Sequence, residues 1–416
     1  MYDKIILDNG LCIIGERIEH FRSVSAGVWI GAGSQYESPA ENGLSHFLEH
    51  MLFKGTTTRT ARDIAEQTDA VGAQLNAFTS KECTCYYIKV IDEHIELALD
   101  MLSDMVLNST LSDEELAKEK GVIIEEIGMN EDSPEDVVFE MLAKALFGAN
   151  PLGMTILGPA GNIRGFKRDD LVRYRARMYR PGNTVLALAG HYDWDRVVEL
   201  AGRMFGGWSA GEEARQPEPC RLCYGLERRE KDIEQVQVCL GLKGVEAGSS
   251  DVYALSIFNN IFGGSMSSRL FQRIREEQGL AYSVYSYPTS YRDCGALAIY
   301  AGTGPEHAQQ VLASLRGEID RALDEGVSER EFIQAREQLK GSYILGLESA
   351  SSRMSALGRR MLLMRDTMDE NQVIKRINEV TLDDVNRVLR ASLAGDYAVA
   401  LMGKGVNGLD LSMFGK

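Results

Sequence analysis

The 416-residue chain has no run of eighteen apolar residues, so we expect no transmembrane span. Its opening residues, MYDKIILDNGLCIIGERI, are interrupted by charges and followed by no small-residue cleavage site, which favours a hairpin at Asn9-Gly10 over a secretory signal. The cysteines number only seven, an odd count. Without a secretory signal, this is typical of reduced thiols, and we expect a cytoplasmic protein.

A single C-x-x-C, Cys220 to Cys223, has no second pair nearby to complete a zinc knuckle, so we expect no metal or redox role for it. Basic residues are also scarce: 45 Lys and Arg stand against 61 Asp and Glu, a net charge of -16. This dilution of positive charge argues against nucleic acid as a partner. The hydrophobic share of 44% and charged share of 25% are ordinary for a soluble globular protein.

A composition break divides the chain near its middle. Gly, Pro and charged residues cluster in FGGWSAGEEARQPEPCRLCYGLERRE, and apolar periodicity stops there. We therefore predict a first domain at 1–208, a linker at 209–228 and a second domain at 229–416. Helix-like segments recur across the break, 43–55 with 253–265 at an offset of 210 and 111–127 with 327–343 at an offset of 216. Such a repeat indicates duplication of one domain.

Each half alternates segments with the apolar patterns of strands and helices. In the first half we predict strands in 22–34 and 75–90, and helices in 60–73, with Thr60 as its cap, and in 93–108. The pattern predicts an α+β fold of two related domains, each a largely antiparallel sheet packed against helices on one side.

The segment ENGLSHFLEHMLFKGT, residues 41–56, carries the main chemical signal. Its apolar residues recur at i, i+3, i+4, i+7 and i+8, which predicts a helix that Asn42 can cap and Gly55 can end. At 100° per residue, His50 lies about 40° from His46, and Glu49 lies about 60° away on the other side. The three polar side chains therefore share one arc beside the apolar stripe.

Two imidazoles one turn apart can bind one zinc ion, and a neighbouring carboxylate can take a proton from metal-bound water. The order of His46, Glu49 and His50 is H-x-x-E-H, the reverse of the commoner H-E-x-x-H. With only six histidines, the pattern should arise by chance in on the order of one such chain in a hundred. The alternative is a solvated helix with two surface imidazoles.

A zinc site needs a third protein ligand, and the other histidines have no partners at ligand spacing. The segment EELAKEKGVIIEEIGMNED offers Glu119, Glu125 and Glu126. Glu119 and Glu126 are seven residues apart and share one helix face, so one could bind zinc while the other orients a histidine or the water.

On these residues the chain resembles the pitrilysin/insulinase family of zinc peptidases, the inverzincins, and in particular their short, mitochondrial-processing-peptidase-like branch. The resemblance implies one Zn2+ per chain, held by His46, His50 and a glutamate about 75 residues further on. Since 126 − 50 = 76, it assigns that role to Glu126 and a supporting catalytic role to Glu119. It makes Glu49 the general base. Glu125 stays open as the rival ligand.

The resemblance extends to substrate binding. LNAFTSKE resembles the family's edge strand, whose backbone pairs with extended substrate, and this implies contact at Asn76, Ala77 and Phe78. RIREEQGLAYSVYS resembles an element that reaches the site from the second domain, and it implies that Arg275 and Tyr282 are catalytic. Without the resemblance, these segments are an ordinary strand and a salt-bridged helix followed by a strand.

The second half lacks the metal motif. At the two offsets, the five site residues of the first half face residues that are poor zinc ligands: Ser256, Asn259, Asn260, Ala335 and Ser342. We expect a non-catalytic second domain, and overall a zinc metalloendopeptidase that cleaves peptides or unfolded segments as a homodimer enclosing a chamber. The alternative is a non-catalytic structural or regulatory subunit on the same fold, which the intact motif disfavours.

Overall fold

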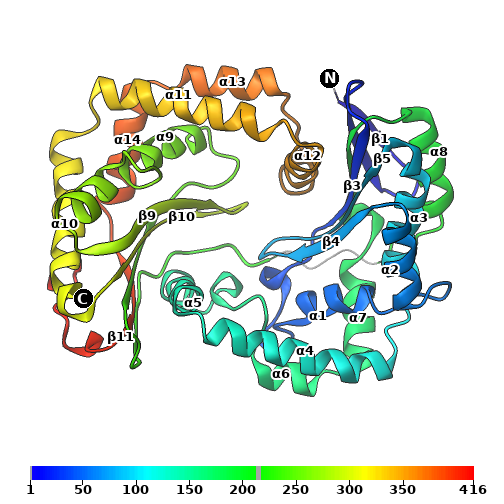
Figure 1. Cartoon of the computed structure of the whole chain (residues 1–416), viewed down its shortest axis with the longest axis horizontal. Coiled ribbons are helices and arrows are strands. Elements are labelled where there is room, and N and C mark those ends of the chain that lie inside the picture. Colours follow the sequence, from blue (N-terminus) through cyan, green and yellow to red (C-terminus); the bar gives the residue numbers. More distant parts are fainter. Residues whose placement is uncertain (1, 212–216) are drawn as a thin grey trace. The chain divides into compact units, whose positions relative to one another are not determined.

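The computed structural model describes residues 2–211 and 217–416, which form two compact units (Figure 1). The first comprises Met1–Gly128, Met154–Pro217 and Leu345–Asp369, and the second comprises Met129–Gly153, Glu218–Ile344 and Glu370–Lys416. The units differ from the expected domains 1–208 and 229–416 in two segments. Met129–Gly153, from the first half of the sequence, belongs to the second unit, and Leu345–Asp369, from the second half, belongs to the first unit. Of the expected linker 209–228, residues 212–216 lie outside the described residues.

The first unit is built on a six-stranded sheet with the order β1-β2-β6-β3-β5-β4. Its strands are β1 Asp3–Ile6, β2 Cys12–Arg17, β3 Ser23–Ile30, β4 Gln74–Thr79, β5 Thr84–Ile91 and β6 Thr184–Gly190. All neighbours pair antiparallel except β2 and β6. The hairpin at Asn9-Gly10 is confirmed, whereas the single strand expected in 75–90 is two strands joined by a tight turn.

Helices cover both faces of this sheet. They are α1 Leu44–Leu52, α2 Ala61–Ala70, α3 Ile95–Asn108, α4 Asp113–Glu131, α6 Ala160–Gly165, α7 Arg168–Met178, α8 Trp194–Phe205 and α12 Ala350–Met364. The core on one face joins α1, α3, α7 and α8 to alternate strand residues. The expectation that helices lie on one side was incomplete, because α12 packs on β3 and β6 from the other face (Figure 1).

The close approach of α12 depends on glycine. A Cβ on Gly358 would lie 2.3 Å from the indole nitrogen of Trp29, and a Cβ on Gly27 would lie 2.6 Å from Met354 Sδ. The Trp29 indole N–H donates to Met354 Sδ at 3.2 Å. Helix α12 therefore packs closely on the sheet because Gly358 makes room for Trp29 and Gly27 makes room for Met354.

The second unit repeats the plan. Its sheet has the order β7-β11-β8-β10-β9. The strands are β7 Leu226–Glu230, β8 Val236–Lys243, β9 Ala281–Ser290, β10 Gly295–Thr303 and β11 Ala398–Gly403; the helices are α5 Pro134–Phe147, α9 Val252–Phe262, α10 Ala308–Glu325, α11 Glu329–Gly346, α13 Glu370–Glu379 and α14 Leu382–Leu393. Helices α9, α10 and α14 contribute to the core on one face, and α5 packs on the other, against β8 and β11 (Figure 1).

Both sheets follow one topology. Counting strands in chain order from β2 and from β7, the spatial order is first, fifth, second, fourth, third in each, with a parallel pair between first and fifth. Helix α11 begins 216 residues after α4 (329 − 113), the offset found in the sequence. The α+β class with two related domains is thus confirmed. Among the described helices, none is long and apolar enough to cross a membrane.

Candidate metal centre

Helix α1 presents the H-x-x-E-H side chains, and its start is fixed by a buried carboxylate. Its N-cap is Gly43, at φ 105°, which supplies no side-chain cap. Glu37 accepts hydrogen bonds from the backbone N–H groups of Gly43 at 2.8 Å and Ser45 at 2.6 Å, and from Asn42 Nδ2 at 3.0 Å. The expectation that Asn42 caps the helix was wrong, because its amide donates to Glu37 and to the Thr155 carbonyl.

The two histidines and one glutamate converge. Glu126 Oε2, on α4, lies 3.6 Å from His46 Nε2 and 3.5 Å from His50 Nε2. The imidazole centroids are 4.6 Å apart. Ligand atoms of these three residues all lie within 4.8 Å of one another, and no other group of this kind occurs among the described residues. Glu125, the rival ligand, is exposed and outside the group.

The donor set fits a zinc ion. Glu126 Oε2 is buried and has no hydrogen-bond partner among the described residues, although two ring nitrogens flank it. Burial, together with the neighbouring His50, lowers the pKa of His46 to about 3, which keeps this imidazole neutral. Two neutral imidazoles and a carboxylate are a known zinc-binding set that leaves a fourth position for water.

A second carboxylate orients His50 from behind. Glu119, on α4, has a side chain only 4% exposed, and its Oε2 lies 3.2 Å from His50 Nδ1. Because a carboxylate only accepts, Nδ1 carries the proton and Nε2 keeps its lone pair for a metal. The other oxygen of Glu119 accepts from Lys54 Nζ at 2.7 Å. Lys54 therefore pairs with this buried carboxylate and holds Glu119 in place, a role that no motif in the sequence indicates.

Glu49 faces the sheet from α1. Its Oε2 accepts a hydrogen bond from Thr79 Oγ1 at 2.5 Å, at the end of β4. Burial raises the pKa of Glu49; the Thr79 bond and His50 oppose that rise, and Glu126 adds to it. A half-buried carboxylate with a raised pKa beside a metal-binding group has the properties of a general base. Thr79 was not among the expected site residues.

Strand β4 is an edge strand within the described residues, as the family resemblance implied. The Ser80 N–H donates to the Cys83 carbonyl at 2.8 Å, which marks this opposed pair as hydrogen-bonded. Alternation along the ladder then directs the main-chain groups of Asn76 and Phe78 toward β5 and those of Ala77 and Thr79 to the free edge.

The Asn76 side chain partly covers the free edge of β4. The Ala77 N–H donates to Asn76 Oδ1 at 2.8 Å. The Phe78 ring, 38% exposed, packs edge-on against Trp29 with centroids 5.5 Å apart. Of the three expected substrate contacts, Ala77 therefore offers main chain, while Asn76 and Phe78 offer side chains.

Arg275 and Tyr282 belong to the second unit and lie together there. The Arg275 guanidinium is 5.0 Å from the centroid of the Tyr282 ring and 4.7 Å from that of Phe271. Tyr282 is 74% exposed, so its ring and hydroxyl are accessible. The pair forms a cationic, aromatic surface of the second unit.

The counterparts of the metal residues in the second unit have structural bonds. Ser256 Oγ donates to the Val252 carbonyl at 2.8 Å, and Asn259 Oδ1 accepts from Ser286 Oγ at 2.7 Å. Together with the missing ligand types, these contacts agree with a second domain that lacks the metal motif.

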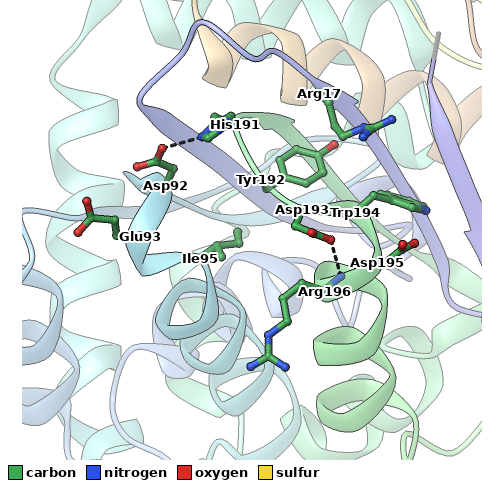
Figure 2. Close-up of a pocket in the computed structure, with 10 residues that line it drawn as sticks. All are labelled: Arg17, Asp92, Glu93, Ile95, His191, Tyr192, Asp193, Trp194, Asp195 and Arg196. Atoms are coloured by element: carbon green, nitrogen blue, oxygen red, sulfur yellow. Dashed lines mark hydrogen bonds and ion pairs between the residues drawn. The ribbon is translucent and has the colours of Figure 1, made fainter.

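The first unit also contains a cavity of about 750 Å³ away from the metal group, between β2, the start of α3 and the start of α8 (Figure 2). Several of its charged groups pair with residues outside the lining, as Arg17 does with Asp3 and Arg196 with Glu96. His191 Nδ1 lies 2.6 Å from Asp92 Oδ2, and Asp193 accepts from the Arg196 N–H at 2.9 Å as the cap of α8. These bonds stabilise the ends of secondary structure, and we assign the cavity no catalytic role.

Comparisons with known proteins identify the class that this fold and site define. The insulinase family model (peptidase family M16) matches residues 13–160, and the model of the peptidase M16 inactive domain matches residues 165–339. The chain therefore belongs to the insulinase family, and its second domain is of the type described as inactive.

Relatives and solved structures agree. A Bacillus subtilis protein described as the uncharacterized zinc protease YmxG is 44% identical over 402 residues, covering 97% of this chain and 98% of that protein. An uncharacterized zinc protease of Streptomyces coelicolor is 38% identical, covering 96% and 89%. The crystal structure of a protease from Helicobacter pylori has a TM-score of 0.91 at 20% identity, covering 97% of this chain and 99% of that one, which shows the shared fold. The relatives' names support a zinc-dependent peptidase.

Proposed function

We propose that the chain is a zinc metalloendopeptidase that cleaves peptides or unfolded polypeptide segments. The observation that carries the proposal is the buried, partnerless Glu126 Oε2 between His46 Nε2 and His50 Nε2, with Glu49 one residue before the second histidine. His46, His50 and Glu126 hold one Zn2+. When bound, the ion supplies a Lewis acid that polarises a carbonyl and lowers the pKa of water.

The chain's own residues perform the proton transfers. Glu49 takes the proton of the attacking water and delivers it to the leaving amine, while Thr79 holds one of its oxygens through their hydrogen bond. Glu119 fixes the orientation of His50 through Nδ1, and Lys54 holds Glu119 in place through their ion pair. Glu119 is thus a positioning residue under this proposal.

Substrate binds as an added strand on β4. Its main chain pairs with the outward groups of Ala77 and Thr79, which leads it past Glu49, the hydrogen-bond partner of Thr79. The Asn76 side chain releases the Ala77 N–H when the peptide arrives. Because a segment must be extended to pair in this way, peptides and unfolded chains are accepted and compact folded domains are not.

We further propose that Arg275 and Tyr282 bind the substrate main chain and stabilise the developing oxyanion. Arg275→Ala and Tyr282→Phe should then reduce kcat/KM for peptides without changing zinc content. A normal kcat/KM in both variants would remove them from the mechanism.

The expected homodimer is also a proposal, and light scattering should give roughly twice the 46.1 kDa chain mass.

The function is tested by one substitution. Glu49→Gln should retain one zinc per chain, because Glu49 is not a ligand. Its turnover of an unstructured peptide should be about 10²- to 10⁴-fold lower than that of the wild type. A variant that cleaves at the wild-type rate would contradict the assignment. Wild-type protein that binds zinc yet cleaves no peptide would favour the alternative, a non-catalytic structural or regulatory subunit.

A further inference from the structure

The seven cysteines fall into two classes by burial. Four are buried, and burial raises the pKa of each thiol: Cys12, Cys83, Cys85 and Cys239. Buried thiols of this kind are inert. The other three, Cys220, Cys223 and Cys294, are partly or fully exposed, and all belong to the second unit. Any thiol chemistry of the native chain is therefore concentrated there.

Two of the accessible thiols contact each other across a long stretch of sequence. The Cys220 N–H donates to Asp293 Oδ2 at 2.8 Å, which places Cys220 against the turn between β9 and β10. That turn is closed by the bond from the Tyr291 N–H to the Cys294 carbonyl at 2.8 Å. The two sulfurs hydrogen-bond each other, and this bond lowers the pKa of Cys220 despite the opposing effects of burial and Asp293.

The third accessible thiol is held elsewhere. The Cys223 N–H donates to the Leu146 carbonyl of α5 at 2.7 Å, and its Sγ donates to the Arg221 carbonyl at 3.7 Å. Although Cys220 and Cys223 form a C-x-x-C sequence, the contact between thiols is therefore not between these two residues. The partner of Cys220 is Cys294, which sequence spacing could not reveal.

We propose that Cys220 and Cys294 are a redox modification site that forms a reversible intramolecular disulfide when a hydroperoxide oxidises the protein. The Cys220 thiolate attacks the peroxide oxygen, which gives a sulfenic acid and, with one proton, releases water. The Cys294 thiol then displaces the sulfenic oxygen as a second water, and the S–S bond forms. Two thiols lose two electrons and two protons, and one hydrogen peroxide becomes two waters. The site is independent of the proposed peptidase function.

The cross-link would join distant segments. It closes a loop of 294 − 220 = 74 residues. Cys220 lies two residues after the start of the Glu218–Ile344 segment of the second unit, and the cross-link joins it to the start of β10. Intracellular disulfides of this type are commonly transient and redox-sensing. A small dithiol such as dithiothreitol should reverse it.

The sequence makes the test direct, because trypsin separates the three thiols. Cleavage after Arg221 places Cys220 in 216–221, Cys223 in 222–228 and Cys294 in 293–316. The native full chain is treated with a small excess of hydrogen peroxide, alkylated, digested without reductant and analysed by mass spectrometry. We expect peptides 216–221 and 293–316 to appear as one linked species in most molecules, and to separate after dithiothreitol.

Two variants make the result specific. Cys223→Ser should leave the linked peptide unchanged, and Cys294→Ser should abolish it and leave a sulfenic acid on 216–221 that dimedone traps. The proposal is overturned if the linkage joins Cys220 to Cys223, if it forms between two molecules, or if all three thiols stay reduced while the peroxide is consumed.

Discussion

Replacing Glu37 with alanine should loosen the helix that carries both histidines. This carboxylate is only 2% exposed, although the residue lies outside the metal motif. It accepts hydrogen bonds from the N–H groups of Gly43 and Ser45 at the start of α1, three residues and one residue before His46. Glu37→Ala leaves both donors buried.

The expected cost follows from those bonds. Each stranded buried donor costs about 1–3 kcal/mol, so two give roughly 2–6 kcal/mol. Burial raises the pKa of Glu37, which means that the native protein already bears a cost for ionising it at neutral pH. Removing that cost offsets part of the loss, and we expect a net destabilisation of about 2–4 kcal/mol.

The assay can address the first unit alone. All three tryptophans, Trp29, Trp194 and Trp208, belong to this unit, so tryptophan fluorescence in urea reports on its unfolding. We expect the midpoint for Glu37→Ala to fall clearly, together with a weaker zinc affinity in a chelator competition. A midpoint equal to that of the wild type would refute the assignment of Glu37 as the cap of α1.

A matched control is available in the same unit. Glu66 on α2 is a glutamate whose side chain is 60% exposed and whose ion pair is with Arg62, one turn away. Glu66→Ala should cost less than about 0.5 kcal/mol. If both variants unfolded alike, loss of a buried acceptor would not be the cause.

Three further outcomes are expected. Glu126→Gln should lower zinc occupancy measured by plasma emission while Glu125→Gln should not, and zinc retained by the first variant would exclude Glu126 as a ligand. Glu119→Gln should weaken zinc affinity or activity by about 10- to 100-fold, and an unchanged competition curve would contradict its contact with His50. Burial opposes ionisation of Glu331, but bonds from Arg269 and Ser328 outweigh it and hold its pKa at about 2. The ionised carboxylate therefore contributes about 1–2 kcal/mol to stability, after allowing for solvent screening, above pH 4.5, and this contribution is lost as pH falls toward 2. In Glu331→Gln, the protection of α11 amides from hydrogen exchange should therefore fall less between pH 4.5 and pH 2 than in the wild type. Equal pH profiles would contradict this.

The sequence predicted the parts of the site that share one helix. His46, Glu49 and His50 lie within one turn and a half, so local spacing determines their common face. Glu119 and Glu126 also lie on one helix, and their spacing placed them on a common face. What spacing could not choose was Glu126 over Glu125; that choice came from the family resemblance and agrees with the converging atoms.

Residues that act across sequence distance were missed. Glu37 precedes α1 on an irregular segment and shows no periodicity, and Thr79 reaches Glu49 only because β4 packs beside α1. The turn at Ser80 was overlooked because apolar and β-branched residues flank it on both sides. Helix α12 shows a helical pattern, but nothing in that pattern indicates that it packs on the first sheet.

The central claim is that His46, His50 and Glu126 hold one zinc ion that peptide cleavage requires. The most direct measurement removes metal from the purified chain with a chelator, returns Zn2+ in steps, and follows cleavage of an unstructured peptide by mass spectrometry. We predict no cleavage by the metal-free protein and recovery that saturates at one equivalent per chain, with no recovery in His46→Ala. Full cleavage by metal-free protein, or full recovery in that variant, would contradict the account.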